Sequence, residues 1–317
     1  MRRVGEDRSG GFADRSHLER KPLKRHFLLV FLIPLFLPPA GNAWSAENQL
    51  RVEIFPKVIK QGEAYLVRAA GPPSVKSISG EFQGKKFFLA SAAGSGRFDA
   101  LIGVDLDSKP GKYDLKVEGT DGGGKVFSKS IPLKIEKNDF TVQKLTLPKS
   151  MVDLDPKTLE RVNRESARVR KVFAGVREEK LWKGPFVRPL EGEVSGAFGV
   201  RRVINGQNKS PHSGIDLRAE AGTPVSACND GIAALVDDLF FSGKTVVLDH
   251  GWGLYSMYFH LSEAGVSAGD KLRTGDTLGR VGSTGRSTGP HLHWGMILRG
   301  ARVDPLSFLR LTQHLQE

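Results

Sequence analysis

Five of the chain's eight histidines fall between positions 212 and 293, and their spacing suggests a metal site. His291 and His293 are two residues apart, in a segment whose apolar neighbours favour a strand. Residues i and i+2 of a strand point to the same face, so both imidazoles can converge on one site. A cluster of histidines beside a suitably spaced carboxylate is a common ligand set for zinc.

The carboxylate of this set is Asp216, which follows His212 by four positions. A proline before this segment and a glycine inside it argue against a helix, and in an extended chain the even spacing places both side chains on one side. Two histidines and a carboxylate provide three protein ligands and leave the fourth tetrahedral position open, which is typical of catalytic rather than structural zinc. Together with His260, within Tyr258–Leu261, these motifs predict a catalytic metal centre.

The segment Pro189–Leu306 resembles the lysostaphin/LytM-type zinc metallopeptidase family of cell-wall endopeptidases. The resemblance covers about 120 residues, and its motifs occur in the family's order. They are Pro189–Gly192, Phe198–Arg201, His212–Asp216, Gly222–Val225, Asp249–Gly251, Tyr258–Leu261, Gly282–Gly285 and the residues from there to His293.

The resemblance implies a role for each of the five residues. In the family, the residues that match His212, Asp216 and His293 bind zinc, and those that match His260 and His291 act in catalysis beside the metal. Zinc lowers the pKa of a bound water to about 7, and a neutral histidine can then accept the proton and deliver it to the leaving amine. His291 is the expected base, and His260 is expected to assist it or to stabilise the oxyanion. The implied function is zinc-dependent cleavage of stem or bridge peptides of peptidoglycan.

Two other functions fit parts of the same region. Residues 266–278 resemble the second half of a lipoyl or biotinyl carrier domain, but the lysine between two apolar residues that such a domain needs is missing. The second alternative is a catalytically weak or inactive domain that binds peptidoglycan and activates another wall hydrolase. Degenerate family members lack metal ligands, whereas this chain keeps all three, which favours catalysis.

Other reactive or aromatic residues of the region have simpler interpretations. His250 stands in a segment typical of a strand end and turn, which favours a structural role. Cys228 is the only cysteine, which excludes an intrachain disulfide, and its apolar surroundings in sequence favour a small buried residue over a nucleophile. Trp252, Tyr255 and Trp294 are expected either to line a substrate groove or to pack in the core.

Residues 47–137 are expected to form an immunoglobulin-like β-sandwich. Apolar and charged residues alternate along 113–118 and 131–136, and turn signals such as the three glycines at 122–124 separate about seven short strands. The region contains no histidine and no catalytic constellation. Its expected role is binding or spacing.

The rest of the chain completes a mainly β architecture. Residues 138–184 are predicted to be a connector with one helix of about five turns, since Asp155 followed by Pro156 forms a helix start and apolar residues then recur at helical spacing. Residues 185–310 are rich in glycine and short strands, which predicts an all-β, lysostaphin-type peptidase domain.

Residues 1–43 combine basic residues with the apolar run Phe27–Leu37. This run is too short to span a bilayer as a helix, and it fits a signal peptide that ends with Gly41 and Ala43 at the −3 and −1 positions. An uncleaved N-terminal anchor is the alternative. Either way, the protein is expected to be exported, to the periplasm or the cell envelope.

The charge of the chain is consistent with export to the envelope. Residues 1–43 hold eight Lys/Arg and four Asp/Glu, so their removal would lower the formal net charge from +12 to +8. A basic exported protein can contact anionic wall polymers or a membrane surface, although scattered solvated lysines explain the charge equally well. No nucleic-acid-binding motif is present, so a nucleic acid is not an expected partner.

Overall fold

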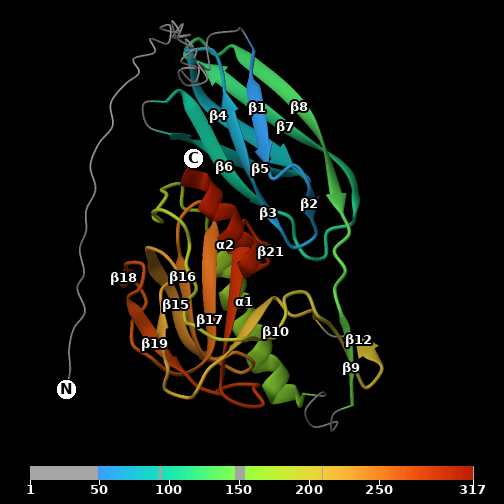
Figure 1. Ribbon diagram of the computed structural model, residues 1–317, viewed down its shortest axis with the longest axis vertical. Coiled ribbons are helices and arrows are strands. Elements are labelled where there is room, and N and C mark those ends of the chain that lie inside the picture. Colours follow the sequence, from blue (N-terminus) through green and yellow to red (C-terminus); the bar gives the residue numbers. More distant parts are fainter. Residues whose placement is uncertain (1–48, 93–94, 147–153, 209, 317) are drawn as a thin grey trace, which may run out of the picture. The chain divides into compact units, whose positions relative to one another are not determined.

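The computed structural model describes residues 49–92, 95–146, 154–208 and 210–316 (Figure 1). The predicted signal peptide, residues 1–43, lies outside this part of the chain. In the described residues, neither α-helix is long and apolar enough to cross a membrane.

The N-terminal region forms an eight-stranded sheet in the order β1-β3-β6-β5-β4-β7-β8-β2. The predicted alternation is confirmed in β7 and β8, where Leu115, Val117, Leu133 and Ile135 are buried and the charged residues between them are exposed. These side chains join Tyr65 and others in one apolar core. The strands are β1 (Arg51–Phe55), β2 (Ile59–Lys60), β3 (Ala64–Ala70), β4 (Val75–Phe82), β5 (Lys85–Ala92), β6 (Arg97–Gly103), β7 (Gly111–Asp121) and β8 (Val126–Glu136).

The predicted connector helix is confirmed as α1 (Pro156–Ala174). The Asp155 carboxylate caps its N-terminus by accepting hydrogen bonds from the backbone N–H groups of Lys157 and Thr158. The helix packs on the C-terminal sheet: Glu165 accepts a hydrogen bond of 2.8 Å from the backbone N–H of Phe240. Near the end of the helix, the Phe173 ring contacts the ring of Tyr255.

The C-terminal region is built on a ten-stranded sheet whose main path runs β10-β13-β20-β17-β16-β15-β18. The strands of this path are β10 (Val194–Gly196), β13 (Gly214–Arg218), β15 (Gly231–Leu239), β16 (Gly243–Asp249), β17 (Leu254–Ala264), β18 (Lys271–Leu272) and β20 (His291–Leu298). Strands β14 (Pro224–Ser226), β19 (Thr277–Val281) and β21 (Ala301–Val303) pair beside it. A separate small sheet joins β9 (Val142–Leu145), β11 (Arg201–Ile204) and β12 (Gln207–Asn208).

The prediction that residues 185–310 are all β missed a helix, α2 (Pro305–Gln313), which is followed by the short 3-10 turn η2 (His314–Gln316). Its N-terminus repeats the arrangement at the start of α1, since the Asp304 carboxylate accepts from the N–H groups of Leu306 and Ser307, and Pro305 stands at the first helical position. Phe308 is fully buried and anchors the helix in the C-terminal core. The overall architecture is mainly β, as predicted.

Candidate metal centre and catalytic site

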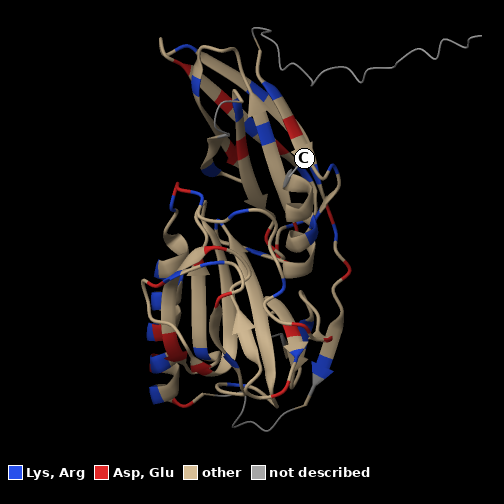
Figure 2. Ribbon diagram, turned by 60° about the vertical axis from the view of Figure 1, so that its left-hand side comes forward, with Lys and Arg blue, Asp and Glu red and all other residues tan. Residues whose placement is uncertain are grey.

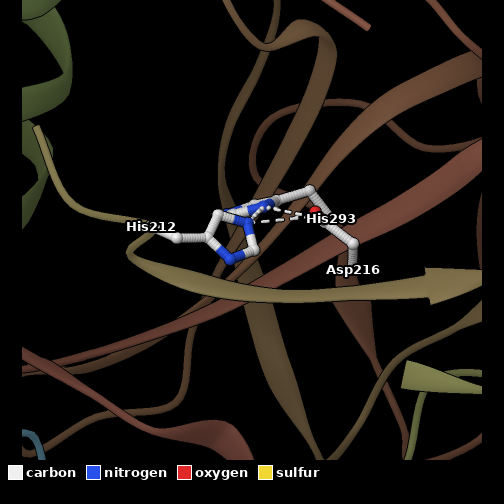
Figure 3. A group of neighbouring side chains, drawn as sticks. All are labelled: His212, Asp216 and His293. Carbon is white, nitrogen blue, oxygen red and sulfur yellow. Dashed lines mark hydrogen bonds and ion pairs between the residues drawn. The ribbon is translucent and has the colours of Figure 1, made fainter. Parts of the chain in front are cut away.

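Two neighbouring strands and one loop bring the predicted metal ligands together. Strands β13 and β20 pair antiparallel, with Asp216 directly opposite His293. His212 lies in the loop before β13, and backbone hydrogen bonds with Gly199 and Val200 hold this loop in place. The extended arrangement predicted for His212 and Asp216 is confirmed, because both side chains point to the same site (Figure 3).

The three ligand atoms form a nearly equilateral triangle. The His212 Nε2 atom lies 3.0 Å from Asp216 Oδ1 and 2.9 Å from His293 Nδ1, and the last two atoms are 2.9 Å apart. A tetrahedral zinc ion with bonds of about 2.0–2.1 Å keeps its ligand atoms only slightly farther apart, at about 3.3 Å. The triangle therefore matches a zinc ion in size.

The protonation states also suit a cation. The Nδ1–H of His212 donates to the backbone carbonyl of Ala197 at 2.7 Å, which leaves the Nε2 atom as the ring nitrogen that can present a lone pair to the cluster. Burial raises the pKa of the Asp216 carboxyl, but its close contacts with the His212 and His293 rings outweigh this effect and hold the pKa well below its ordinary range. Burial also lowers the pKa of His293 and keeps that imidazole neutral. Electron-pair donors thus converge on one point, where a metal ion would stabilise them.

His260 and His291 stand beside the triangle. Their ring centroids are 4.9 Å apart, and the His291 Nε2 atom lies 3.7 Å from Asp216 Oδ1. The Nδ1–H groups of His260 and His291 donate to the carbonyls of Thr284 at 2.8 Å and Gly289 at 2.9 Å. Each Nε2 atom is therefore left to accept a proton. Burial lowers the pKa of His260 to about 4, so this ring is neutral at pH 7.

The structure thus gathers all five residues singled out from the sequence. It also shows contributors that the sequence did not single out. The carbonyls of Ala197 and Thr284 orient two imidazoles, and the Phe259 ring stacks on His293 with centroids 5.1 Å apart and planes 7° apart. A Cβ atom at Gly196 would lie 2.2 Å from Asp216 Oδ2, so only glycine allows this strand to approach the carboxylate.

His250 is separate from this site. It is fully buried, and both ring nitrogens have partners: Nδ1 with the Asp230 carbonyl at 2.7 Å and Nε2 with the Ser256 hydroxyl at 2.8 Å. Cys228 is buried beside it, and burial raises the pKa of its thiol to about 11, which disfavours the thiolate nucleophile. These contacts support the structural roles predicted for both residues.

The three aromatic residues with two open interpretations belong to the core. Trp252, Tyr255 and Trp294 expose 7%, 3% and 0% of their surfaces, so little of any ring is available to a substrate. Their contribution is packing.

Residues 210–305 match the model of Peptidase family M23. This chain is 39% identical over 114 residues to the peptidoglycan DD-endopeptidase ShyA of Vibrio cholerae, covering 36% of this chain and 26% of ShyA. It is 38% identical over 137 residues to the DD-carboxypeptidase/endopeptidase Mpg of Neisseria meningitidis, covering 43% of this chain and 32% of Mpg. The aligned segments thus span about a quarter to a third of these curated relatives.

The crystal structure of an M23 peptidase from Pseudomonas aeruginosa is similar over a much larger part of the chain. At 30% identity and a TM-score of 0.61, the similarity covers 81% of this chain and 96% of that one. This chain belongs to peptidase family M23. The family resemblance inferred from the sequence is confirmed, and with it the lysostaphin-type β fold of the C-terminal region.

Proposed function

We propose that this M23 peptidase is a zinc-dependent endopeptidase that cleaves peptide crosslinks or bridges of peptidoglycan. The observation that carries the proposal is the convergence of His212, Asp216 and His293 on one point, with His260 and His291 beside it. The similarity to proteins named peptidoglycan DD-endopeptidase supports the substrate class.

The five side chains divide the chemistry among them. Zinc held by His212, Asp216 and His293 would act as a Lewis acid and lower the pKa of water to about 7. His291 accepts a proton through its Nε2 atom and delivers it to the leaving amine, while its Nδ1–H stays bonded to the Gly289 carbonyl. His260 assists from the other side, oriented by the Thr284 carbonyl.

The alternative of an inactive, wall-binding activator predicts a broken ligand set. The described site instead keeps three ligand atoms within 4.8 Å of one another, with both accessory histidines in place. This completeness favours catalysis.

We extend the proposal to the other regions of the chain. Residues 1–43 would direct export to the periplasm or cell envelope, as a signal peptide or as an uncleaved anchor. Residues 47–137 would form an immunoglobulin-like sandwich that recruits substrate or covers the site, residues 138–184 the connector, and residues 185–310 the peptidase domain. The positive net charge supports contact with anionic wall polymers or a membrane surface.

Digestion of purified sacculi by residues 44–317 tests the proposal, with released fragments identified by mass spectrometry. We expect new peptide termini at crosslinks or bridges, loss of activity with a chelator, and recovery on addition of zinc. Intact sacculi after treatment with the zinc-loaded protein would contradict it.

A further inference from the structure

A groove of about 820 Å³ runs between α1 and one face of the C-terminal sheet. Its lining includes Phe259, whose ring stacks on His293, and Ser213, which directly follows His212. Part of the groove lining therefore adjoins the metal ligands. A volume of this size is typical of ligand-binding clefts.

The lining of the groove carries an unbalanced charge. Three charged residues line the groove: Glu165, Arg170 and Arg302. Glu165 is bonded to the Arg161 guanidinium at 2.6 Å, and Arg302 to the carboxylate of Asp105 at 2.6 Å.

The third charge, on Arg170, has no such partner in the described part of the chain. Among the residues that the structure describes, no carboxylate lies within 4.0 Å of its guanidinium. Lys and Arg recur along α1 (Figure 2), but two of the arginines outside the groove, Arg164 and Arg168, pair with Glu160 and Asp237. Arg170 thus lines the groove, and its guanidinium forms no ion pair with any described carboxylate.

We propose that Arg170 is a specificity-determining residue that binds a carboxylate of the peptide substrate in this groove. A guanidinium pairs with a carboxylate through two parallel hydrogen bonds, which gives orientation as well as affinity. The inference rests on the proposed peptidase function and narrows its substrate class. Stem peptides crosslinked through a diamino acid that carries a free carboxylate would be preferred over uncharged glycine bridges.

The location of Arg170 also assigns this selectivity to a particular part of the chain. Helix α1 lies outside residues 210–305, which match the family model. The connector would therefore contribute directly to substrate recognition, in addition to joining two regions.

Two synthetic crosslinked stem-peptide dimers test the inference, one with free carboxylates next to the crosslink and one with the same groups as carboxamides. For residues 44–317, we expect kcat/KM to favour the acid form by about 10- to 100-fold, the range for a hydrogen bond to a charged group. Arg170→Gln should bring this ratio close to one, mainly by raising KM for the acid form. The matched control is Lys171→Gln, at an exposed position outside the groove lining, which should keep the ratio.

Binding of the uncleaved dimers to the His291→Ala protein gives a second readout that does not depend on turnover. The acid form should bind more tightly, and Arg170→Gln should remove the difference. Equal cleavage and equal binding of the two forms by the parent chain would overturn the inference while leaving the peptidase function intact. Cleavage of neither dimer, nor of sacculi, would instead overturn the function, and binding would then decide the role of Arg170 separately.

Discussion

Histidines on the two faces of the C-terminal sheet differ in the partners of their ring nitrogens. On the groove face, the His212 Nε2 atom lies 2.9 Å from His293 Nδ1, which in turn lies 2.9 Å from Asp216 Oδ1. These facing atoms are electron-pair donors. On the other face, His250 makes hydrogen bonds to neighbouring groups through both nitrogens, within a network that continues from Ser256 to Tyr258. The first arrangement gathers ligand atoms that a cation would stabilise, whereas the second has a hydrogen-bond partner for each ring nitrogen. Residue type alone would not distinguish them.

The largest expected effect follows from removing a metal ligand. His293→Ala leaves two protein ligands, so the zinc content should fall from about one ion per chain to near zero. Turnover should be lost with it, while the cooperative unfolding transition is kept. Elemental analysis and circular dichroism of the same preparation would check this, and zinc retained at the parent level would show that the ligand assignment is wrong.

Removing the neighbouring base should separate catalysis from metal binding. His291→Ala keeps all three ligands, so zinc content should stay near one per chain while turnover falls about 10²- to 10⁴-fold, as for a positioned general acid–base. His260→Ala should behave similarly and more mildly. If His291→Ala lost the metal while His293→Ala kept it, the two assignments would be reversed.

The same substitution on the opposite face should have a structural effect. His250→Ala creates a buried space and leaves the Asp230 carbonyl and the Ser256 hydroxyl short of a partner. We expect a loss of about 2–4 kcal/mol in the free energy of unfolding, with zinc bound at the parent level in the remaining folded protein. Urea titration measures the loss. An unchanged midpoint combined with lost zinc would contradict the contrast between the two faces.

The last expected effect is a pH dependence of stability that arises from the same residue. Burial lowers the pKa of His250 from 6.5 to about 4, so the unfolded chain binds this proton first as the pH falls. The stability due to neutral His250 is therefore complete above pH 6.5 and is lost progressively between pH 6.5 and 4, by about 3 kcal/mol in all. His250→Asn, which does not titrate, should show a shallower decline in unfolding free energy over this window. Equal slopes for both proteins would assign the pH dependence to other groups.

The features that depend on local periodicity could be predicted from the sequence. The alternation around His291 and His293 placed both imidazoles on one face, and Asp155-Pro156 located the start of α1. The same signal at Asp304-Pro305 marks α2, but the glycine-rich strands before it predict an all-β region, and that prediction does not include this helix.

Other features arise only when distant segments meet. The carbonyls of Ala197 and Thr284 orient His212 and His260, but every residue has a backbone carbonyl, so these two leave no mark in the sequence. The position of Arg170 in the groove depends on how α1 packs on the sheet, which helical periodicity alone does not determine.

The most direct test of the central claim is to locate the metal in crystals of the zinc-loaded protein by anomalous diffraction at the zinc edge. We predict a single strong peak about 2.0–2.2 Å from His212 Nε2, His293 Nδ1 and an Asp216 oxygen. The Nε2 atoms of His260 and His291 should lie outside bonding distance of it. A peak bonded to His291 or His260 instead, or no peak between the three predicted ligands, would contradict the account.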